Sequence, residues 1–388
     1  MKRKLPFVLL LLAVLVALAF FTVAPTVAEW LFNGTRVRGP YHASERGRAL
    51  HATLLVADMH ADTLLWDRDV LARSARGHVD VPRLAEGGVA LQFFTVVSKT
   101  PYAANYDSNP EGLDGVTAIA FAERWPLRAL RSLRERALYQ ARKLNEAATR
   151  SGGRFTVIRT ADDLARFVER RKSDPQLVAG LLGLEGAYPL EGDVAGVDAL
   201  FDAGFRMMAP THFYDNEWGG SAHGVNKTGL TDKGREMVRR MEARGMLVDL
   251  AHASAATITD VVAVSTRPLV VSHTGVRGTC DNNRNLSDEQ LRKIATKGGV
   301  VGIGYWDAAT CGLDAHAVAR AIRHAANVIG VEHVALGSDF DGAVTEPFDT
   351  TGVVLVTDAL LEEGFNEEEV SAIMGGNVFR LLAETLPR

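Results

Sequence analysis

Residues 246–273 read MLVDLAHASAATITDVVAVSTRPLVVSH, and this stretch indicates the fold class most directly. A short apolar run, Met246 to His252, is followed by a longer segment and then by a second apolar run, Leu269 to His273. Each run ends in a histidine. Short apolar, β-branched runs that alternate with longer amphipathic stretches are typical of parallel strands joined by helical crossovers.

The same alternation extends from Thr53 towards the C-terminus and provides eight strand candidates. They are Leu55 to Asp62, Val89 to Val97, Val178 to Glu185, Phe205 to His212, Met246 to His252, Leu269 to His273, Val300 to Trp306 and His333 to Phe340. Between candidates, Ser287 with Gln290 and Asn366 with Glu369 are typical of capping boxes that begin helices. Eight such units predict an α/β protein of the (β/α)8 TIM-barrel type.

A doubly wound open sheet is the alternative fold, because periodicity alone does not distinguish a short strand from buried helix. Five of the eight strand candidates end in His, Asp or Glu, and Asp339 is next to the end of another. This favours the barrel, since barrel enzymes place their chemistry at the carboxyl ends of the strands. We expect one metallohydrolase domain over residues 29–388. An insertion at about 98–177, too long for one crossover, is expected to flank the mouth of the barrel.

Residues 1–28 differ from the rest of the chain. Three basic residues at positions 2–4 precede an uncharged apolar run from Leu5 to Val23. That run exceeds the roughly 7–15 residues of a signal-peptide core and is close to the about 20 residues of a membrane helix. An uncleaved signal anchor is therefore favoured over a cleaved signal peptide, although Thr26-Val27-Ala28 could serve as a cleavage site. Either way the remaining chain is expected to be extracytoplasmic, either membrane-anchored or secreted or periplasmic after cleavage.

The composition is that of an ordinary globular protein, with 388 residues, 47% hydrophobic and 23% charged, and a net charge of -4. These values exclude disordered, collagen-like and coiled-coil chains. Basic residues beyond the N-terminus are scattered, so no electrostatic footprint for nucleic acid is visible and no nucleic-acid partner is expected.

Polar side chains at the strand ends predict a metal centre. They are His60, Asp62, Glu185, His212, His252, His273 and Asp339. His60 and Asp62 are two residues apart on a strand and therefore point the same way. A single histidine after a strand is usually a satisfied core residue, but this succession is hard to attribute to packing. Imidazole and carboxylate together suit zinc, and in a two-metal site one carboxylate bridges the ions while a bound water becomes the nucleophile.

Longer motifs surround these residues. They are His60-Ala61-Asp62-Thr63-Leu64, Gly183-Leu184-Glu185-Gly186, Val248-Asp249-Leu250-Ala251-His252, Ser272-His273, Arg284-Asn285-Leu286-Ser287-Asp288, Ser338-Asp339-Phe340-Asp341-Gly342 and Gly375-Gly376-Asn377. In this order they resemble the renal (membrane) dipeptidase family of zinc metallopeptidases, peptidase family M19. The resemblance covers essentially the whole chain after about residue 50, which makes it more specific than any single motif.

The resemblance implies a dipeptidase that hydrolyses unblocked dipeptides through a hydroxide bridging two zinc ions. His60 and Asp62 would bind one ion, and His252 and His273 the other. Glu185 would bridge the two ions.

Three further residues are implied to act on the substrate. His212 and Arg284 would hold it, and Asp339 would contact its amino group or shuttle the proton. Glu185, His212 and Asp339 are thus the expected catalytic residues, and small dipeptides are the expected partners. Assembly as a homodimer is left open.

One departure from the family pattern is Gly186-Ala187-Tyr188, where members often carry a second glycine and a histidine. It makes substrate preference harder to predict than metal binding. Another amidohydrolase-type enzyme, such as a deaminase or lactonase, is disfavoured because these commonly open with HxH, whereas residue 62 is aspartate. A non-catalytic tethered binding protein is disfavoured because all five expected metal ligands are present.

Cys280 and Cys311 are the only cysteines and follow the sixth and seventh strand candidates. Neighbouring strands of a barrel bring such loops together, so a disulfide is expected in an oxidising compartment. The loop-entropy model assigns it roughly 3–4 kcal/mol of stabilisation. The alternative is a pair of buried thiols. Among the other histidines, His223 is expected at most to line the mouth, and the rest lie outside the pattern of strand ends.

Overall fold

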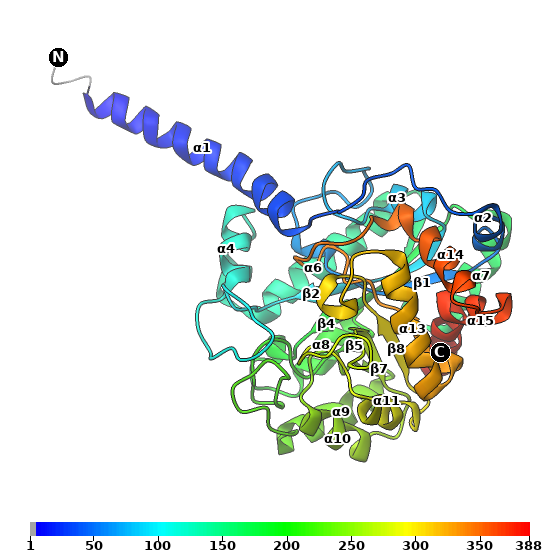
Figure 1. The fold of residues 1–388 in the computed structure, drawn as a ribbon. Helices are drawn as coiled ribbons and strands as arrows, with labels where there is room; N and C mark the ends of the chain where they lie inside the picture. The colour runs from blue at the N-terminus through cyan, green and yellow to red at the C-terminus, as the bar shows by residue number, and fades with distance from the viewer. Residues whose placement is uncertain (1–4) are drawn as a thin grey trace.

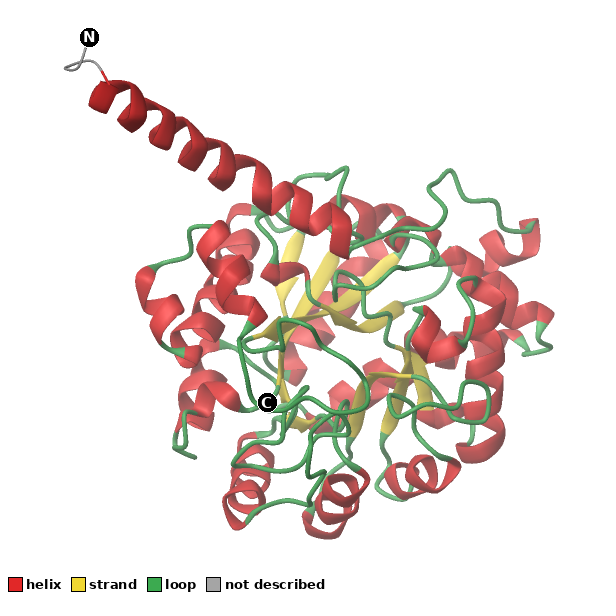
Figure 2. Ribbon diagram, turned by 60° about the vertical axis from the view of Figure 1, so that its left-hand side comes forward, coloured by secondary structure: helices red, strands yellow, loops and turns green. Residues whose placement is uncertain are grey.

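The computed structural model describes residues 5–388, in which parallel strands form an inner wall and helices surround it (Figure 1; Figure 2). The strands are β1 Val56–Ala61, β2 Val89–Val97, β3 Phe155–Val157, β4 Val178–Glu185, β5 Met207–Met208, β6 Leu247–Val248, β7 Val270–Thr274, β8 Val300–Ile303 and β9 Val334–Leu336. Seven of them pair in the order β3-β4-β2-β1-β9-β8-β7, and β5 pairs with β6.

Single parallel bridges connect these two sheets. Leu182 of β4 pairs with Phe205 just before β5, and Asp249 just after β6 pairs with Val270 of β7. The wall therefore runs β1-β2-β4-β5-β6-β7-β8-β9 and returns to β1, with β3 outside it beside β4. This is the (β/α)8 barrel class predicted from the sequence.

Four predicted strands are clearly shorter than expected. β8 covers only Val300–Ile303 of the predicted Val300 to Trp306, and β9 only Val334–Leu336 of the predicted His333 to Phe340. The difference is largest for β5 and β6. Regular pairing covers only Met207–Met208 of the predicted Phe205 to His212, and only Leu247–Val248 of the predicted Met246 to His252. In the second case the Asp249 carboxylate ends the strand, because its Oδ1 accepts hydrogen bonds from the backbone N–H groups of Ala251 and Ser272 at 3.0 and 2.8 Å.

Helices cover the outside of the wall and its two ends (Figure 1). They are α2 Glu45–His51, α3 Val81–Glu86, α4 Gly115–Ala122, α5 Leu127–Arg131, α6 Leu133–Arg150, α7 Ala161–Ser173, α8 Gly196–Ala203, α9 Asp232–Arg244, α10 Ala255–Val264, α11 Asp288–Ala295, α12 Asp307–Thr310, α13 Ala315–Ile329, α14 Val354–Glu362, α15 Glu367–Ser371 and α16 Asn377–Thr385. Both predicted capping boxes are present, at the starts of α11 and α15. The region predicted as an insertion contains α4 to α7 and the short strand β3, which the sequence analysis missed because three residues carry no periodicity.

The N-terminal helix α1, Leu5–Phe32, projects from the barrel as a single rod (Figure 1; Figure 2). It is long and apolar enough to cross a membrane. Residues 7–20 are exposed, whereas Pro25, Glu29 and Asn33 are buried against the barrel. The helix continues past residue 28, where the sequence analysis placed the boundary of the N-terminal segment.

The predicted disulfide is present between Cys280 and Cys311, with their Cα atoms 5.3 Å apart. It joins the loop after β7 to the residue that follows α12, after β8. The disulfide therefore fixes the segment that leads to Arg284.

Candidate metal centre

The residues predicted as metal ligands come together at the carboxyl ends of the strands. His60, Glu185 and His273 lie within β1, β4 and β7 near their ends, and Asp62 directly follows β1. His252 follows β6 in the loop that Asp249 begins. Side chains from four strands therefore meet in one place, and each is at most 6% exposed.

Glu185 lies at the middle of this cluster. Its Oε1 is 3.5 Å from Nε2 of His60, 3.3 Å from Nε2 of His252 and 3.4 Å from Nε2 of His273. Its Oε2 is 3.1 Å from Nε2 of His212. One carboxylate thus faces four imidazoles and is the group that they share.

His60 connects the cluster to two further carboxylates. Its Nε2 is 3.5 Å from Oδ1 of Asp62 and 3.6 Å from Oδ1 of Asp339. The potential ligand atoms form three overlapping groups, His60 with Glu185 and His273, Glu185 with His212 and His252, and His60 with Asp62 and Asp339. His60 and Glu185 each belong to two of these groups, so the three groups form one continuous cluster.

A layer of hydrogen bonds orients these side chains. Oγ of Ser272 lies 3.1 Å from Nδ1 of His60 and 3.0 Å from Nδ1 of His273, and it donates to Oδ2 of Asp249 at 2.6 Å. Thr95 donates to Oδ1 of Asp62 at 2.7 Å. Contacts at Nδ1 leave Nε2 of both histidines facing Glu185, as metal-binding imidazoles require.

The electrostatics of the cluster fit cations. Burial raises the pKa of Glu185 well above its usual value, although His60 lowers it. Burial opposes protonation of His60, but Glu185, Asp62 and Asp339 outweigh it and raise the pKa of His60 to about 10. Nε2 of His60 and Oε1 of Glu185 are buried without a hydrogen-bond partner. Buried carboxylates and unpartnered donor atoms of these types suit divalent ions such as zinc.

Backbone strain accompanies the site. His252 and Asp339 have φ values of 62° and 70°, in the left-handed region that residues other than glycine rarely adopt. Such conformations persist where the surrounding structure determines them, and they concentrate at functional sites. At both positions the strained residue supplies a side chain to the cluster.

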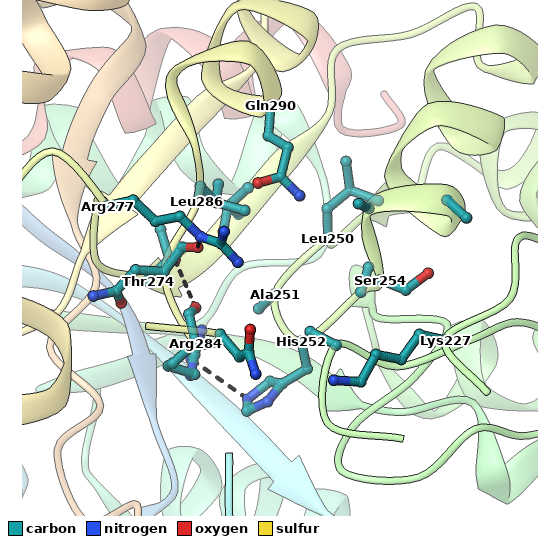
Figure 3. A pocket seen from close by; sticks show the side chains of 17 residues that line it. Lys227, Leu250, Ala251, His252, Ser254, Thr274, Arg277, Arg284, Leu286 and Gln290 are labelled. Carbon is teal, nitrogen blue, oxygen red and sulfur yellow. Dashed lines mark hydrogen bonds between the residues drawn. The ribbon is translucent and has the colours of Figure 1, made fainter. Parts of the chain in front are cut away.

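Arg284 reaches the cluster from the loop after β7. Its Nη2 donates to the carbonyl oxygen of His273 at 3.1 Å. The same atom lies 3.5 Å from Nε2 of His252 (Figure 3). Its guanidinium group lies 5.0 Å from the ring centroid of Trp306. The structure thus brings Arg284 together with all seven strand-end residues predicted from the sequence.

Several neighbours of the site were not assigned a role from the sequence. His223 is fully buried, with its ring centroid 5.1 Å from that of His252, so it lies deeper than the mouth-lining position expected for it. Nδ1 of His223 lies 2.9 Å from the carbonyl oxygen of Tyr106, in the predicted insertion. Asp249 and Ser272 did carry a usable signal, since both lie inside the quoted motifs next to ligand positions.

Comparisons with known proteins agree with this geometry. The family model for membrane dipeptidases, peptidase family M19, matches residues 44–386. Dipeptidase tcpJ of Claviceps purpurea is 29% identical over 331 residues, which cover 82% of this chain and 72% of that protein. Dipeptidase aclJ of Aspergillus oryzae is 33% identical over 224 residues, 54% of this chain and 52% of that protein. The chain thus aligns with about half the length of the latter relative.

Solved structures are similar over almost their whole length. The structure of dipeptidase AC, a metallopeptidase of family M19, has 25% sequence identity and a TM-score of 0.71, covering 87% of this chain and 100% of that one. A Rhodobacter sphaeroides metallopeptidase, liganded with a phosphinate mimic of the dipeptide L-Ala-D-Ala, has 26% identity and a TM-score of 0.70, covering 86% and 99%. On these matches the chain belongs to the membrane dipeptidase family, peptidase family M19.

Proposed function

We propose that this protein is a zinc-dependent dipeptidase that hydrolyses the peptide bond of unblocked dipeptides. The observation that carries the proposal is the convergence of three histidines and two carboxylates on one buried centre, with Arg284 beside it. Family membership and the dipeptidase names of the relatives support the same activity. The dipeptide mimic bound by the Rhodobacter sphaeroides relative supports the substrate class.

Two zinc ions fit the ligand set. His60 and Asp62 would hold one ion, His252 and His273 the other, and Glu185 would contribute to both. When bound, such a pair supplies Lewis acidity and an activated water for attack on a peptide carbonyl. The protein's own part is to fix these side chains in a buried site, where electrostatic interactions are strong.

Arg284 and Asp339 suit recognition of the two ends of a dipeptide. The Arg284 guanidinium can hold a free carboxylate through two parallel hydrogen bonds. Asp339, 3.6 Å from His60, can hold the free amino group. A longer or blocked peptide would leave one of these buried charges unpaired, which typically costs several kcal/mol.

Asp339 also suits proton transfer. Burial raises its pKa to about 7, although His60 lowers it, so this carboxyl can take up and release a proton near neutral pH. A cation in the adjacent centre would favour the ionised, proton-accepting form. When Nε2 of His212 carries a proton, this residue would stabilise the negative charge that develops on the carbonyl oxygen of the substrate.

The test is a joint assay of metal content and hydrolysis on the purified full-length protein. We expect about two zinc ions per chain, cleavage of unblocked dipeptides, and loss of cleavage with a chelator that zinc reverses. N-acetyl dipeptides, dipeptide amides and tripeptides should be cleaved far more slowly. Full activity after metal removal, or equal catalytic efficiency on tripeptides and dipeptides, would contradict the proposal.

We also infer that α1 anchors the protein in a membrane, with the barrel on the extracytoplasmic side. The apolar side chains of residues 7–20 are exposed and are not covered by the barrel, so lipid could surround them. The basic residues at positions 2–4 favour a cytoplasmic N-terminus. The disulfide between Cys280 and Cys311 fits an oxidising compartment.

A further inference from the structure

A cavity of about 310 Å³ adjoins the proposed metal centre on the side of Arg284 and His252. Its wall comes from the loops after β6 and β7, from the start of α10, and from Lys227 in the segment before α9. Neither Glu185 nor Asp62 lines it, so it is a separate compartment beside the centre. His252 and Arg284 form the boundary between the two.

The charged groups in this cavity have one sign. Lys227 and Arg277 line it together with Arg284, and no aspartate or glutamate lines it. Within residues 5–388 neither Lys227 nor Arg277 makes an ion pair with a carboxylate, although Nε of Arg277 donates to the carbonyl oxygen of Asn285 at 3.1 Å. In Figure 3 Arg277 and Lys227 approach the cavity from opposite sides, and the side-chain amide of Gln290 also points into it.

Such a compartment fits an anion. Two cationic side chains without a carboxylate partner, together with the Gln290 amide, provide several N–H groups from which one carboxylate can accept hydrogen bonds. No aspartate or glutamate lines the cavity, so a bound anion would not contact a carboxylate there. A free inorganic anion could accept hydrogen bonds from the same donors. The substrate is the favoured occupant because Arg284, the proposed partner of its terminal carboxylate, also lines the cavity.

We propose that this cavity is the subsite for the side chain of the C-terminal residue, and that it selects dipeptides ending in aspartate or glutamate. The inference rests on the proposed dipeptidase function, in which Arg284 holds the terminal carboxylate. The Cα atom of the last residue then lies beside Arg284, so its side chain can enter the cavity that Arg284 lines. The volume holds an acidic side chain with several waters, since one water occupies roughly 30 Å³ in the liquid.

The expected preference is moderate. Arg277 is exposed and Lys227 is half-buried, so solvent and salt screen their charges. Hydrogen bonds to charged groups in such positions correspond to a selectivity of about tenfold or somewhat more. Because these contacts form before the chemical step, the preference should be seen in KM more than in kcat.

The test compares Ala-Glu with Ala-Gln, which have nearly the same shape and differ in charge, using zinc-loaded full-length protein. Both epimers of the second residue are assayed, because inversion exchanges the directions of the side chain and the carboxylate. We expect the wild type to have a kcat/KM about tenfold higher for Ala-Glu in at least one epimeric series. The ratio should fall towards one in the double variant Lys227→Gln/Arg277→Gln, and also at high salt.

The matched control is Arg320→Gln, which removes one positive charge from an exposed site on the outer helix α13. It should keep the wild-type ratio. A wild-type ratio of one or less in both series, or a ratio unchanged in the double variant, overturns the subsite while dipeptide hydrolysis itself still stands. Inhibition of Ala-Gln cleavage by phosphate without any preference for Ala-Glu would assign the cavity to a free anion instead. Failure to cleave any dipeptide would overturn the proposed function and the subsite with it.

Discussion

Glu185 is the residue on which the proposed centre depends most. Its two carboxylate oxygens lie 3.1–3.5 Å from four imidazole nitrogens, and no other carboxylate in the described residues has such a position. Loss of the Glu185 charge therefore removes the group that the surrounding nitrogens share.

The first prediction concerns Glu185→Gln, which keeps the volume of the side chain and removes its charge. Bound zinc should fall below about two ions per chain and kcat/KM by at least about 100-fold, because an amide is a poor zinc ligand. Elemental analysis of the purified variant, together with a dipeptide assay, measures both. Glu217→Gln, at an exposed position, should leave both unchanged. Wild-type zinc content and activity in Glu185→Gln would remove this residue from the centre.

The second prediction concerns Arg284→Ala. It should raise KM for dipeptides and narrow the difference between a dipeptide and its C-terminal amide, because the lost guanidinium recognises only the carboxylate. The measurement is kcat/KM for both substrates in the wild type and the variant. If the wild type cleaves amides as efficiently as free acids, Arg284 does not hold the carboxylate.

At the scale of elements, the end of α1 is tied to the loop that carries Asp339. Glu29 forms ion pairs with Arg68 and Arg76, and Arg68 pairs with Asp341 at 2.5 Å. The chain after α1 then pairs with the same loop, since the backbone N–H of Arg36 donates to the carbonyl oxygen of Glu346 at 2.8 Å. The root of the proposed anchor therefore supports the strained backbone beside the metal centre.

The third prediction follows from this contact. Glu29→Ala leaves the Arg68 guanidinium with one fewer buried partner, so we expect a loss of about 3 kcal/mol in the free energy of unfolding. A lower kcat at unchanged zinc content should accompany it, because the Asp339 loop loses part of its support. Denaturant unfolding and dipeptide kinetics of the full-length chain measure the two effects. Trp30→Ala, on the exposed face of the same turn, is the control and should show neither.

A fourth prediction concerns the packing of α2 against α14. His51 of α2 is buried, with Nδ1 2.7 Å from Oγ1 of Thr357 and Nε2 2.9 Å from the carbonyl oxygen of Gly87. Burial lowers its pKa below 6.5, although the Gly87 carbonyl opposes the shift. Below pH 6.5 the unfolded chain therefore binds a proton that the folded chain does not. The contribution of neutral His51 to the free energy of unfolding should be complete above that pH. It should be lost as the pH falls towards the folded-state pKa of His51.

The loss can reach about 1.4 kcal/mol for each pH unit within that window. Denaturant unfolding between pH 7.5 and pH 5 should show a shallower pH dependence in His51→Gln than in the wild type. His42→Gln, at an exposed histidine, should keep the wild-type slope. Equal slopes in His51→Gln and the wild type would contradict the prediction.

At the scale of the whole molecule, α1 and α4 indicate which side of the barrel would face the membrane. The Phe121 ring of α4 lies 5.4 Å from that of Phe21 and 6.4 Å from that of Phe20, yet its side chain is 54% exposed. Leu113, in the loop just before α4 begins, is 82% exposed. An apolar surface that continues from a membrane helix is typical of a segment at the lipid interface.

The fifth prediction uses the fact that both native cysteines form the disulfide, so an introduced cysteine is the only free thiol. In proteoliposomes a fluorophore on Leu12→Cys or Leu113→Cys should be quenched by a lipid-soluble quencher. A fluorophore on Lys172→Cys, an exposed position of α7, should be quenched only from water. Aqueous quenching at Leu12→Cys would contradict the membrane anchor, and aqueous quenching at Leu113→Cys alone would contradict the interfacial position of α4.

Much of the barrel could be predicted because its signals are local. The bounds of β2 and β4 were obtained in full, since both are long and mostly apolar runs. β5 and β6 were overestimated. For β6, an apolar run does not reveal that the Asp249 carboxylate will accept hydrogen bonds from the backbone N–H groups of Ala251 and Ser272. The helix caps were predictable because a cap needs only residues three apart in the chain.

The sequence by itself determined the barrel class, the strand-end residues that meet at the centre, and the membrane-compatible first helix, because each is encoded in the periodicity or order of neighbouring residues. Only the tertiary structure decided that Lys227 and Arg277 share a cavity with Arg284, that Glu29 supports the Asp339 loop, and that His223 is buried beside His252. These contacts join segments far apart in the chain. Their existence depends on how the loops pack over the barrel, and no local pattern records that packing.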